Sequence, residues 1–254
     1  MKQNQIAVQL YSLRDQMRDK NEIRSTLQAL SAAGIKAVEL AGTGEYTPIE
    51  FKALCDEFGL VICSSHESGE FLCEETAAAI DKMKLLGCKH VAYPYPHLPL
   101  KSVADLQKLA QKLNVAGRKL AAAGIKLAYH NHAIEFEKHD GKTGMDYFID
   151  ESSIDSLYFQ PDMYWVQFGG KDPVTYCEKL TGRLTMIHVK EYGIIDNAVA
   201  TPPAGQGNLD WPAIIAAAEA GGAEWFIIEQ EGAGELTPFE AVVKSYEYLT
   251  TLVD

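Results

Sequence analysis

The sequence predicts an α/β fold in which eight parallel strands close into a (βα)8 TIM barrel, a single domain spanning residues 1–254. Short apolar runs recur along the whole chain at intervals of roughly 30 residues, the length of one strand and its return helix. Alanine-rich amphipathic stretches separate these runs, and most of them end in glycine. The length of 254 residues also matches the usual size of one such barrel, about 250 residues.

Eight apolar runs are the expected strands, and most of them end in a polar side chain. They cover residues 6–11, 37–40, 61–66, 90–93, 126–130, 157–160, 186–188 and 225–229. Glycines stand where helices should stop, because glycine readily adopts the left-handed conformation that ends a helix. These are Gly34, Gly59, Gly87, Gly124 and Gly222. The repeated unit favours parallel strands with helical crossovers over the alternative, an open doubly wound sheet, which would not usually need eight units.

Charge and composition argue against several classes of partner. The net charge of −12 disfavours nucleic acid, because phosphate binding needs clustered Lys and Arg. No apolar stretch reaches the roughly 18 residues of a membrane span, and the first residues lack the apolar segment of a secretory signal. Five cysteines without paired short spacing indicate reduced thiols. We therefore expect a cytoplasmic protein without nucleic-acid or membrane partners, and homo-oligomerisation stays open.

Carboxylates and imidazoles follow the last four predicted strands. Because the carboxyl ends of barrel strands open into one shared mouth, we expect these side chains to meet there. The candidate metal ligands are Glu135, Asp162, His188 and Glu229. Oxygen and nitrogen donors without a thiol suit one divalent cation, and they do not choose among Mn²⁺, Mg²⁺, Co²⁺, Fe²⁺ and Zn²⁺.

Each of these donors also has a structural explanation. Asp162 could cap a helix or start a turn, and His188 could be a hydrogen-bonded core residue. Lys190 lies two residues after His188 on the same strand face, so that two polar groups would enter one interior, which favours a functional site. Glu229 follows four apolar or aromatic residues, where a buried carboxylate is costly unless a cation or hydrogen bonds accept it.

The end of the fifth strand leaves the division of roles open. His130 and His132 share one strand face, and Glu135 lies just beyond the strand end. Any of the three could reach a metal, and the two histidines could instead transfer protons near neutral pH. Hydrogen bonding within the loop is the structural alternative for each.

Other strand ends are expected to complete a small-molecule pocket, in which aromatic faces and short polar groups would suit a ring such as that of a sugar. The candidates for substrate binding are Tyr11, Glu39, His66, Tyr93, His130 and Trp165. Packing or surface exposure is the alternative for each of them. The sequence lacks a Gly-X-X-X-X-Gly-Lys phosphate loop, which slightly favours an unphosphorylated substrate. Residues 193–210 have loop composition and lie between the last two predicted strands.

Five short motifs in one order carry a family resemblance. They are Tyr129-His-Asn-His-X-X-Glu-Phe, Pro161-Asp-X-X-Trp165, Ile187-His-Val-Lys190, Gly205-Gln-Gly-Asn-Leu-Asp-Trp211 and Ile228-Glu-Gln-Glu231. Together they resemble the sugar isomerase/epimerase group of the xylose-isomerase-like TIM barrels. The resemblance covers almost the whole chain, and it is more specific for the superfamily than for the substrate.

The resemblance implies a divalent metal held by a carboxylate from strand five, an aspartate, a histidine and a glutamate. The last three match Asp162, His188 and Glu229. Many relatives carry the first ligand as a glutamate at the end of strand five, where this chain has His130. Glu135 is therefore the expected first ligand, with His130 as the second choice.

The chemistry implied by the resemblance removes a proton beside a carbonyl. A metal on adjacent oxygens of a hydroxy-ketone stabilises the resulting enediolate. Return of the proton then isomerises or epimerises the sugar, whereas loss of a β-hydroxyl dehydrates it. His132, Glu135 and Lys190 are the candidate proton carriers, and Lys190 could instead hold a substrate oxygen as a point charge.

Alternative functions from other classes are less well supported. A lyase acting on a keto-inositol or keto-glycoside uses the same chemistry and stays open. An apurinic endonuclease of this superfamily would need more histidines than seven and a basic surface. A non-catalytic sugar-binding barrel would not require an acid, an imidazole and a glutamate converging on one point.

Overall fold

A computed structural model describes residues 1–232 and 234–253. Eight of its strands form one parallel sheet in the spatial order β8, β5, β4, β3, β2, β1, β12 and β9. These strands are β1 (Ile6–Gln9), β2 (Ala37–Leu40), β3 (Val61–His66), β4 (His90–Tyr93), β5 (Lys126–His130), β8 (Tyr158–Gln160), β9 (Met186–Val189) and β12 (Trp225–Ile228). Parallel bridges from Phe159 to Leu184 and from Asp162 to His188 join the two outer strands, so that the barrel is nearly closed. The predicted (βα)8 fold is confirmed.

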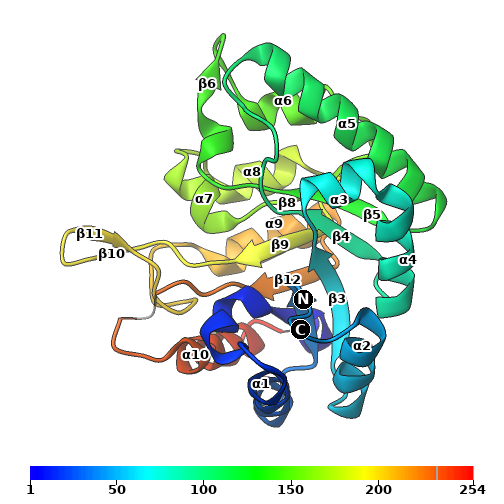
Figure 1. The fold of residues 1–254 in the computed structure, drawn as a ribbon. Coiled ribbons are helices and arrows are strands. Elements are labelled where there is room, and N and C mark those ends of the chain that lie inside the picture. Colours follow the sequence, from blue (N-terminus) through cyan, green and yellow to red (C-terminus); the bar gives the residue numbers. More distant parts are fainter. Residues whose placement is uncertain (233, 254) are drawn as a thin grey trace.

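Helices surround the strands, as Figure 1 shows. The α-helices are α1 (Lys20–Ala32), α2 (Pro48–Glu57), α3 (Gly69–Glu74), α4 (Thr76–Leu86), α5 (Val103–Ala122), α6 (Gly144–Asp150), α7 (Met163–Phe168), α8 (Pro173–Lys179), α9 (Trp211–Gly221) and α10 (Pro238–Thr250). In α5, buried residues such as Leu106, Leu109, Leu113 and Leu120 recur at the spacing of one helix face, which packs on the barrel. Short 3₁₀ helices cover η1 (Gln3–Gln5), η2 (Leu10–Gln16) and η3 (Ile134–Phe136).

Glycines end the helices as the sequence predicts. Gly87 and Gly222 are C-caps with φ of 68° and 105°, a conformation that strains any residue with a Cβ. The other three predicted positions also have positive φ. The caps turn the chain sharply into the next strand, which keeps the repeat short.

The barrel interior holds two layers of side chains that matter for the site. A small apolar cluster fills the lower part of the interior: Ala7, Ala37, Cys63, Ala128, Met186 and Ile227. Residues two positions further along the same strands face the same interior, because side chains alternate along a strand. That second layer contains Gln9, Glu39, His130, His188 and Glu229, all buried. Because side chains alternate along each strand, polar side chains from several strands lie together at the carboxyl ends of the strands.

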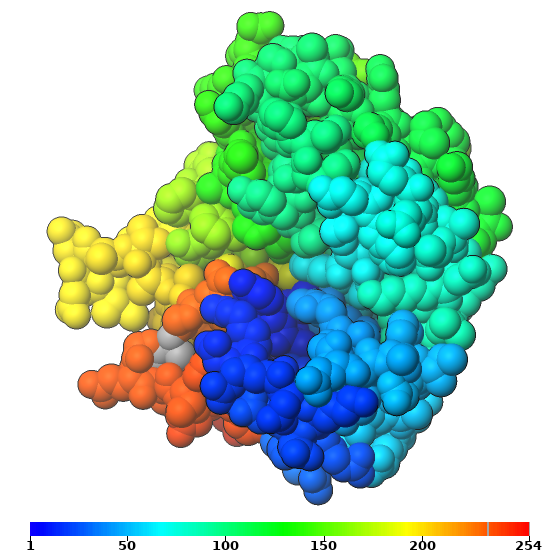
Figure 2. Space-filling model, in the orientation of Figure 1, coloured from blue at the N-terminus to red at the C-terminus, as the bar shows by residue number. Residues whose placement is uncertain are grey.

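Two hairpins depart from the barrel repeat. Strands β10 (Gly193–Ile195) and β11 (Ala198–Ala200) form an antiparallel hairpin within the predicted loop 193–210, and Figure 2 shows this yellow segment projecting from the body. Strands β6 (Lys138–His139) and β7 (Lys142–Thr143) form the other. The five cysteines are free thiols. None of the helices in the described part of the chain is long and apolar enough to cross a membrane.

Candidate active site

Four donor side chains converge at the carboxyl ends of neighbouring strands. One ligand atom each from His130, Asp162, His188 and Glu229 lies within 4.8 Å of the others, and all four residues are buried. Donors about 2.0 to 2.2 Å from one metal lie at most about 4.4 Å apart, so that a contraction of a few tenths of an ångström would suffice. We refer to these four residues as the donor cluster.

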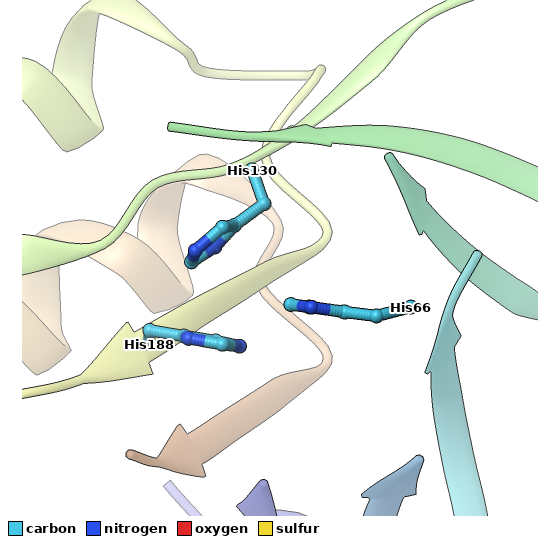
Figure 3. Close-up of side chains that lie close together, drawn as sticks. All are labelled: His66, His130 and His188. Atoms are coloured by element: carbon cyan, nitrogen blue, oxygen red, sulfur yellow. The ribbon is translucent and has the colours of Figure 1, made fainter. Parts of the chain in front are cut away.

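Three imidazole rings meet at the polar layer, to which two of them belong. His66, His130 and His188 come from β3, β5 and β9, and Figure 3 shows their rings pointing toward one another. The ring centroids of His130 and His188 are 4.4 Å apart, and those of His66 and His188 are 5.4 Å apart in a stacked arrangement. Strands far apart in the sequence therefore supply one imidazole-rich interior.

His188 lies between two carboxylates. Its Nδ1 is 2.5 Å from Oε2 of Glu229, and its Nε2 is 2.6 Å from Oε2 of Glu39. Burial alone would lower the pKa of His188, but the two carboxylates outweigh burial and raise this pKa to about 10. Burial would likewise raise the pKa of Glu39, yet His66 and His188 hold it well below its usual range. Nδ1 of His188 faces Glu229, a member of the donor cluster, and Nε2 faces Glu39, which can orient the ring.

Glu39 lies deeper than the sequence suggested. It was expected to contact substrate at the mouth, but its side chain is fully buried beneath the donor cluster. Its Oε1 accepts a hydrogen bond from Gln160 Nε2 at 2.6 Å, and its Oε2 accepts one from Gln9 Nε2 at 2.7 Å. The reason is that Glu39 precedes the end of β2 and points into the barrel interior.

Asp162 caps a helix and also belongs to the donor cluster. It is the N-cap of α7, because its Oδ1 accepts a hydrogen bond from Trp165 N at 3.1 Å. Its Oδ2 is buried without a hydrogen-bond partner among the described residues, as is Nδ1 of His130. Burial and the neighbouring Glu229 raise the pKa of Asp162. Two buried polar atoms without hydrogen-bond partners, on two residues of the donor cluster, fit a bound cation.

The strand-five donor in the structure is His130 rather than Glu135. Glu135 lies in η3, where its carboxylate accepts hydrogen bonds from Tyr129 Oη at 3.0 Å and from the backbone N–H of His132 at 2.7 Å. Burial raises the pKa of Glu135. The 3₁₀ turn after β5 directs this side chain to the loop backbone, so the structure does not bring it into the donor cluster.

His132 lies beside the donor cluster. Its ring is 4.9 Å from that of His130 and 5.7 Å from that of Trp165, and its buried Nδ1 has no partner in the described structure. Burial lowers the pKa of His132 to about 4, so the ring is neutral near pH 7. A neutral imidazole with a free nitrogen can accept a proton.

Lys190 is a buried cation next to the cluster. Its Nζ is 2.6 Å from Oε2 of Glu231 and 3.4 Å from Oε1 of Glu229, and it lies over the rings of Tyr164 and Trp165. Burial would lower the pKa of Lys190, but Asp162 and the two glutamates raise it above its usual value. Lys190 therefore stays protonated and acts as a fixed positive charge.

A cavity of about 380 Å³ opens above the cluster, within the size range of small-molecule pockets. Its walls include the predicted residues Tyr11, His66, His130, His132 and Glu229, and also Gln9, Ala41, Pro94, Tyr95 and Glu231. Tyr11 lies in η2 rather than at the end of a strand, because β1 stops at Gln9.

Besides Glu39, two of the residues expected to bind substrate do not line the cavity, and the aromatic lining residue Tyr95 was not predicted. Tyr93 is buried, with its hydroxyl hydrogen-bonded to His97, and Trp165 contacts His132 from outside the cavity wall. Tyr95, which sequence reasoning missed, is 56% exposed at the rim. In the sequence, Tyr95 stands two residues past the fourth predicted strand, and this position could have indicated that it lies at the rim of the cavity.

The whole chain was compared with known proteins. A model of the xylose isomerase-like TIM barrel family matches residues 27–252, and the chain belongs to that family. No curated protein matches the sequence.

Solved structures share the fold over nearly the full length. A sugar phosphate isomerase/epimerase from Parabacteroides distasonis is 26% identical, with 98% of this chain and 95% of that chain covered and a TM-score of 0.83. A xylose isomerase-like TIM barrel protein from Mycobacterium smegmatis in complex with magnesium is 16% identical, with coverage of 99% and 98% and a TM-score of 0.77. A probable 3-DHS dehydratase from Bacillus anthracis is 16% identical, with coverage of 98% and 99% and a TM-score of 0.72. The last two similarities concern the fold alone.

Proposed function

We propose that this protein is a divalent-metal-dependent sugar isomerase or epimerase that acts on a keto-sugar or a related polyol. The observation that carries the proposal is the donor cluster beneath the cavity, with the unpartnered Oδ2 of Asp162 and Nδ1 of His130. A buried group of carboxylates and imidazoles without thiols suits a divalent cation. The similarity to a sugar phosphate isomerase/epimerase supports the same reaction class.

The cation would be held by His130, Asp162, His188 and Glu229. When bound, a divalent cation polarises a carbonyl and stabilises negative charge on its oxygen. Glu39 would accept a hydrogen bond from the Nε2–H group of His188 and so favour the tautomer in which Nδ1, once it has lost its proton, can bind the cation. The chain thus contributes both the donors and their orientation.

His132 is the proposed proton carrier. It lines the cavity, its Nδ1 is unpartnered, and it is neutral near pH 7. It would take the proton from the carbon beside the carbonyl and return it to the neighbouring carbon or to the opposite face. Lys190 would hold a fixed positive charge opposite the developing oxyanion rather than act as a base.

A dehydratase acting on a keto-sugar or keto-inositol is the second candidate, and one observation favours it. The carboxylate of Glu135 is bonded to Tyr129 and the loop backbone, so strand five supplies imidazoles but no carboxylate base for a two-base epimerisation. The same proton removal by His132, followed by loss of a β-hydroxyl, would give a dehydrated product.

Exchange of carbon-bound protons in deuterated water tests the proposal. Metal-loaded protein should introduce deuterium beside the carbonyl of one or more sugars from a panel of ketoses and ring-keto sugars. Prior treatment with a chelator should abolish the exchange, and added Mn²⁺, Co²⁺ or Mg²⁺ should restore it. Product analysis separates an isomer or epimer from a dehydrated product. Exchange that is unaffected by the chelator, or absent with every sugar, contradicts the proposal.

A further inference from the structure

The cavity is lined by polar side chains at its base and by aromatic rings at its rim. The donor cluster closes the base, whereas Tyr11 and Tyr95 form aromatic walls at the rim, 46% and 56% exposed. Tyr11 follows β1 and Tyr95 follows β4, and two strands separate β1 from β4 in the sheet. The two rings therefore stand on different sides of the mouth. Exposed aromatic rings beside a concave site offer flat apolar faces to a ligand.

The cavity walls carry acidic groups and no free cation. Glu229 and Glu231 line the cavity, and none of the described lining residues is Lys or Arg. The nearest cation, Lys190, is 2% exposed and already pairs with both glutamates, at 3.4 and 2.6 Å. A phosphate ester on the substrate would find no free Lys or Arg side chain among these lining residues, although charge-assisted bonds from such cations are the usual means of binding phosphate.

Arg14 is an exposed cation close to this mouth, and it lies behind Tyr11. Its guanidinium is 4.3 Å from the centroid of the Tyr11 ring, and its Nη1 donates to the Tyr11 carbonyl at 2.9 Å. Arg14 lines a separate cavity of about 140 Å³, which also touches Gly42 and Phe51. The Tyr11 ring thus separates the guanidinium from the site.

We infer that the substrate is an uncharged, unphosphorylated carbohydrate whose end remote from the donor cluster carries a ring that stacks on Tyr95 or Tyr11. The inference rests on the proposed function for the reacting keto group and adds the chemical class of the remainder of the molecule. It separates this chain from the sugar phosphate substrate that the name of its structural relative suggests.

Equilibrium binding tests the inference without requiring turnover. Metal-loaded protein is titrated by calorimetry with methyl glucoside, phenyl glucoside and glucose monophosphate. Phenyl glucoside should bind about 3- to 10-fold more tightly than methyl glucoside, the range expected for one aromatic contact. Glucose monophosphate should bind no more tightly than methyl glucoside. Replacing both Tyr11 and Tyr95 by Ala should abolish the preference for the phenyl ligand, and replacing both by Phe should keep it.

The competing outcome is that the protein binds a phosphate group through Arg14. Tighter binding of glucose monophosphate that is lost in Arg14→Gln, but kept in the exposed control Arg118→Gln, would overturn the inference. Equal binding of the two glucosides, or no binding of either, would overturn it as well.

Ring-keto forms of the same two glucosides are then assayed for exchange in deuterated water. A phenyl preference in binding without exchange on any keto-sugar would reject the proposed reaction and leave the inferred pocket in place.

Discussion

His132 illustrates how one side chain can serve the reaction without holding the fold together. It is half-buried beside the donor cluster, and its Nδ1 has no partner in the described structure. Its removal should therefore leave the neighbouring ligands in place. A neutral imidazole at this position is suited to proton transfer near pH 7.

His132→Ala should lower turnover by roughly 10²- to 10⁴-fold, the usual contribution of a positioned acid or base. Metal content should stay unchanged, because His132 is not part of the donor cluster. Turnover and metal content are measured side by side, with His139→Ala in β6 as the matched control. Near-full activity of His132→Ala, or loss of its metal, would show that the residue is structural or a ligand.

Glu39 should act on the metal through His188. The carboxylate accepts from Nε2 of His188 at 2.6 Å and does not itself line the cavity. Glu39→Gln should weaken metal binding by about 10- to 100-fold, as expected when a partner that orients a ligand is changed. Metal affinity is measured by calorimetry. Glu67→Gln, a buried carboxylate that pairs with Lys82 instead, is the control and should bind metal normally. Equal affinity in all three proteins would exclude this orienting role.

At the scale of elements, the sequence predicted the positions of the strands but not the conformation of the turn that follows β5. All eight apolar runs form barrel strands, and the glycine stops were placed correctly, because both features follow from local periodicity and backbone preference. The position of Glu135 depended on the 3₁₀ turn after β5, and that of Glu39 on contacts with residues more than a hundred positions away. Neither is encoded in a local pattern.

The connection between β9 and α9 depends on Glu191. This buried carboxylate accepts hydrogen bonds from Gly205 N at 2.8 Å, Leu209 N at 3.1 Å and Trp211 Nε1 at 2.7 Å. These hydrogen bonds hold the segment that follows the β10–β11 hairpin against Glu191. Counting the backbone N–H of Tyr192, four N–H groups donate hydrogen bonds to this one carboxylate. This explains why the Gly-Gln-Gly-Asn-Leu-Asp-Trp motif needs this acid.

Glu191→Ala should lower the free energy of unfolding by roughly 2 to 4 kcal/mol, because four N–H groups, including the buried ring N–H of Trp211, lose their acceptor. Urea unfolding measures the change, and the exposed Glu178→Ala is the control, expected to stay within about 0.5 kcal/mol. A change of that small size in Glu191→Ala would contradict the anchoring role.

At the scale of the whole molecule, the two ends of the barrel have different tasks. The carboxyl ends of the strands hold the polar layer and the cavity, while the opposite end is closed by charge pairs and apolar packing. Glu224, just before β12, lies 3.4 Å from His90 and pairs with Lys126. These contacts join β12, β4 and β5 at the end remote from the site.

The Glu224 contacts make a contribution to stability that depends on pH. His90 and Lys126 lower the pKa of Glu224 to about 2, although partial burial opposes them. A lowered carboxyl pKa stabilises the fold above the unfolded value of about 4.5, and the effect is lost as the pH falls to about 2. Because the side chain is 46% exposed, water screens the pair, and Glu224→Gln should cost only about 0.5 kcal/mol at pH 6.

Unfolding experiments at several pH values check this expectation. The difference between wild type and Glu224→Gln should vanish near pH 2, and metal content should be equal in both proteins. Glu137→Gln, an exposed carboxylate away from these strands, serves as the control. A difference that is constant with pH would show that Glu224 acts through packing rather than through its charge.

The metal content of two matched variants tests the donor cluster most directly. Asp162 and Asp172 are both N-caps, of α7 and α8, and asparagine caps a helix about as well as aspartate. Asp162→Asn should therefore stay folded but lose most of its metal, because a carboxylate in the cluster becomes a neutral amide. Asp172→Asn and the wild type should each hold about one divalent cation per chain by elemental analysis. Equal metal content in all three proteins, or none in the wild type, would contradict a metal centre at Asp162.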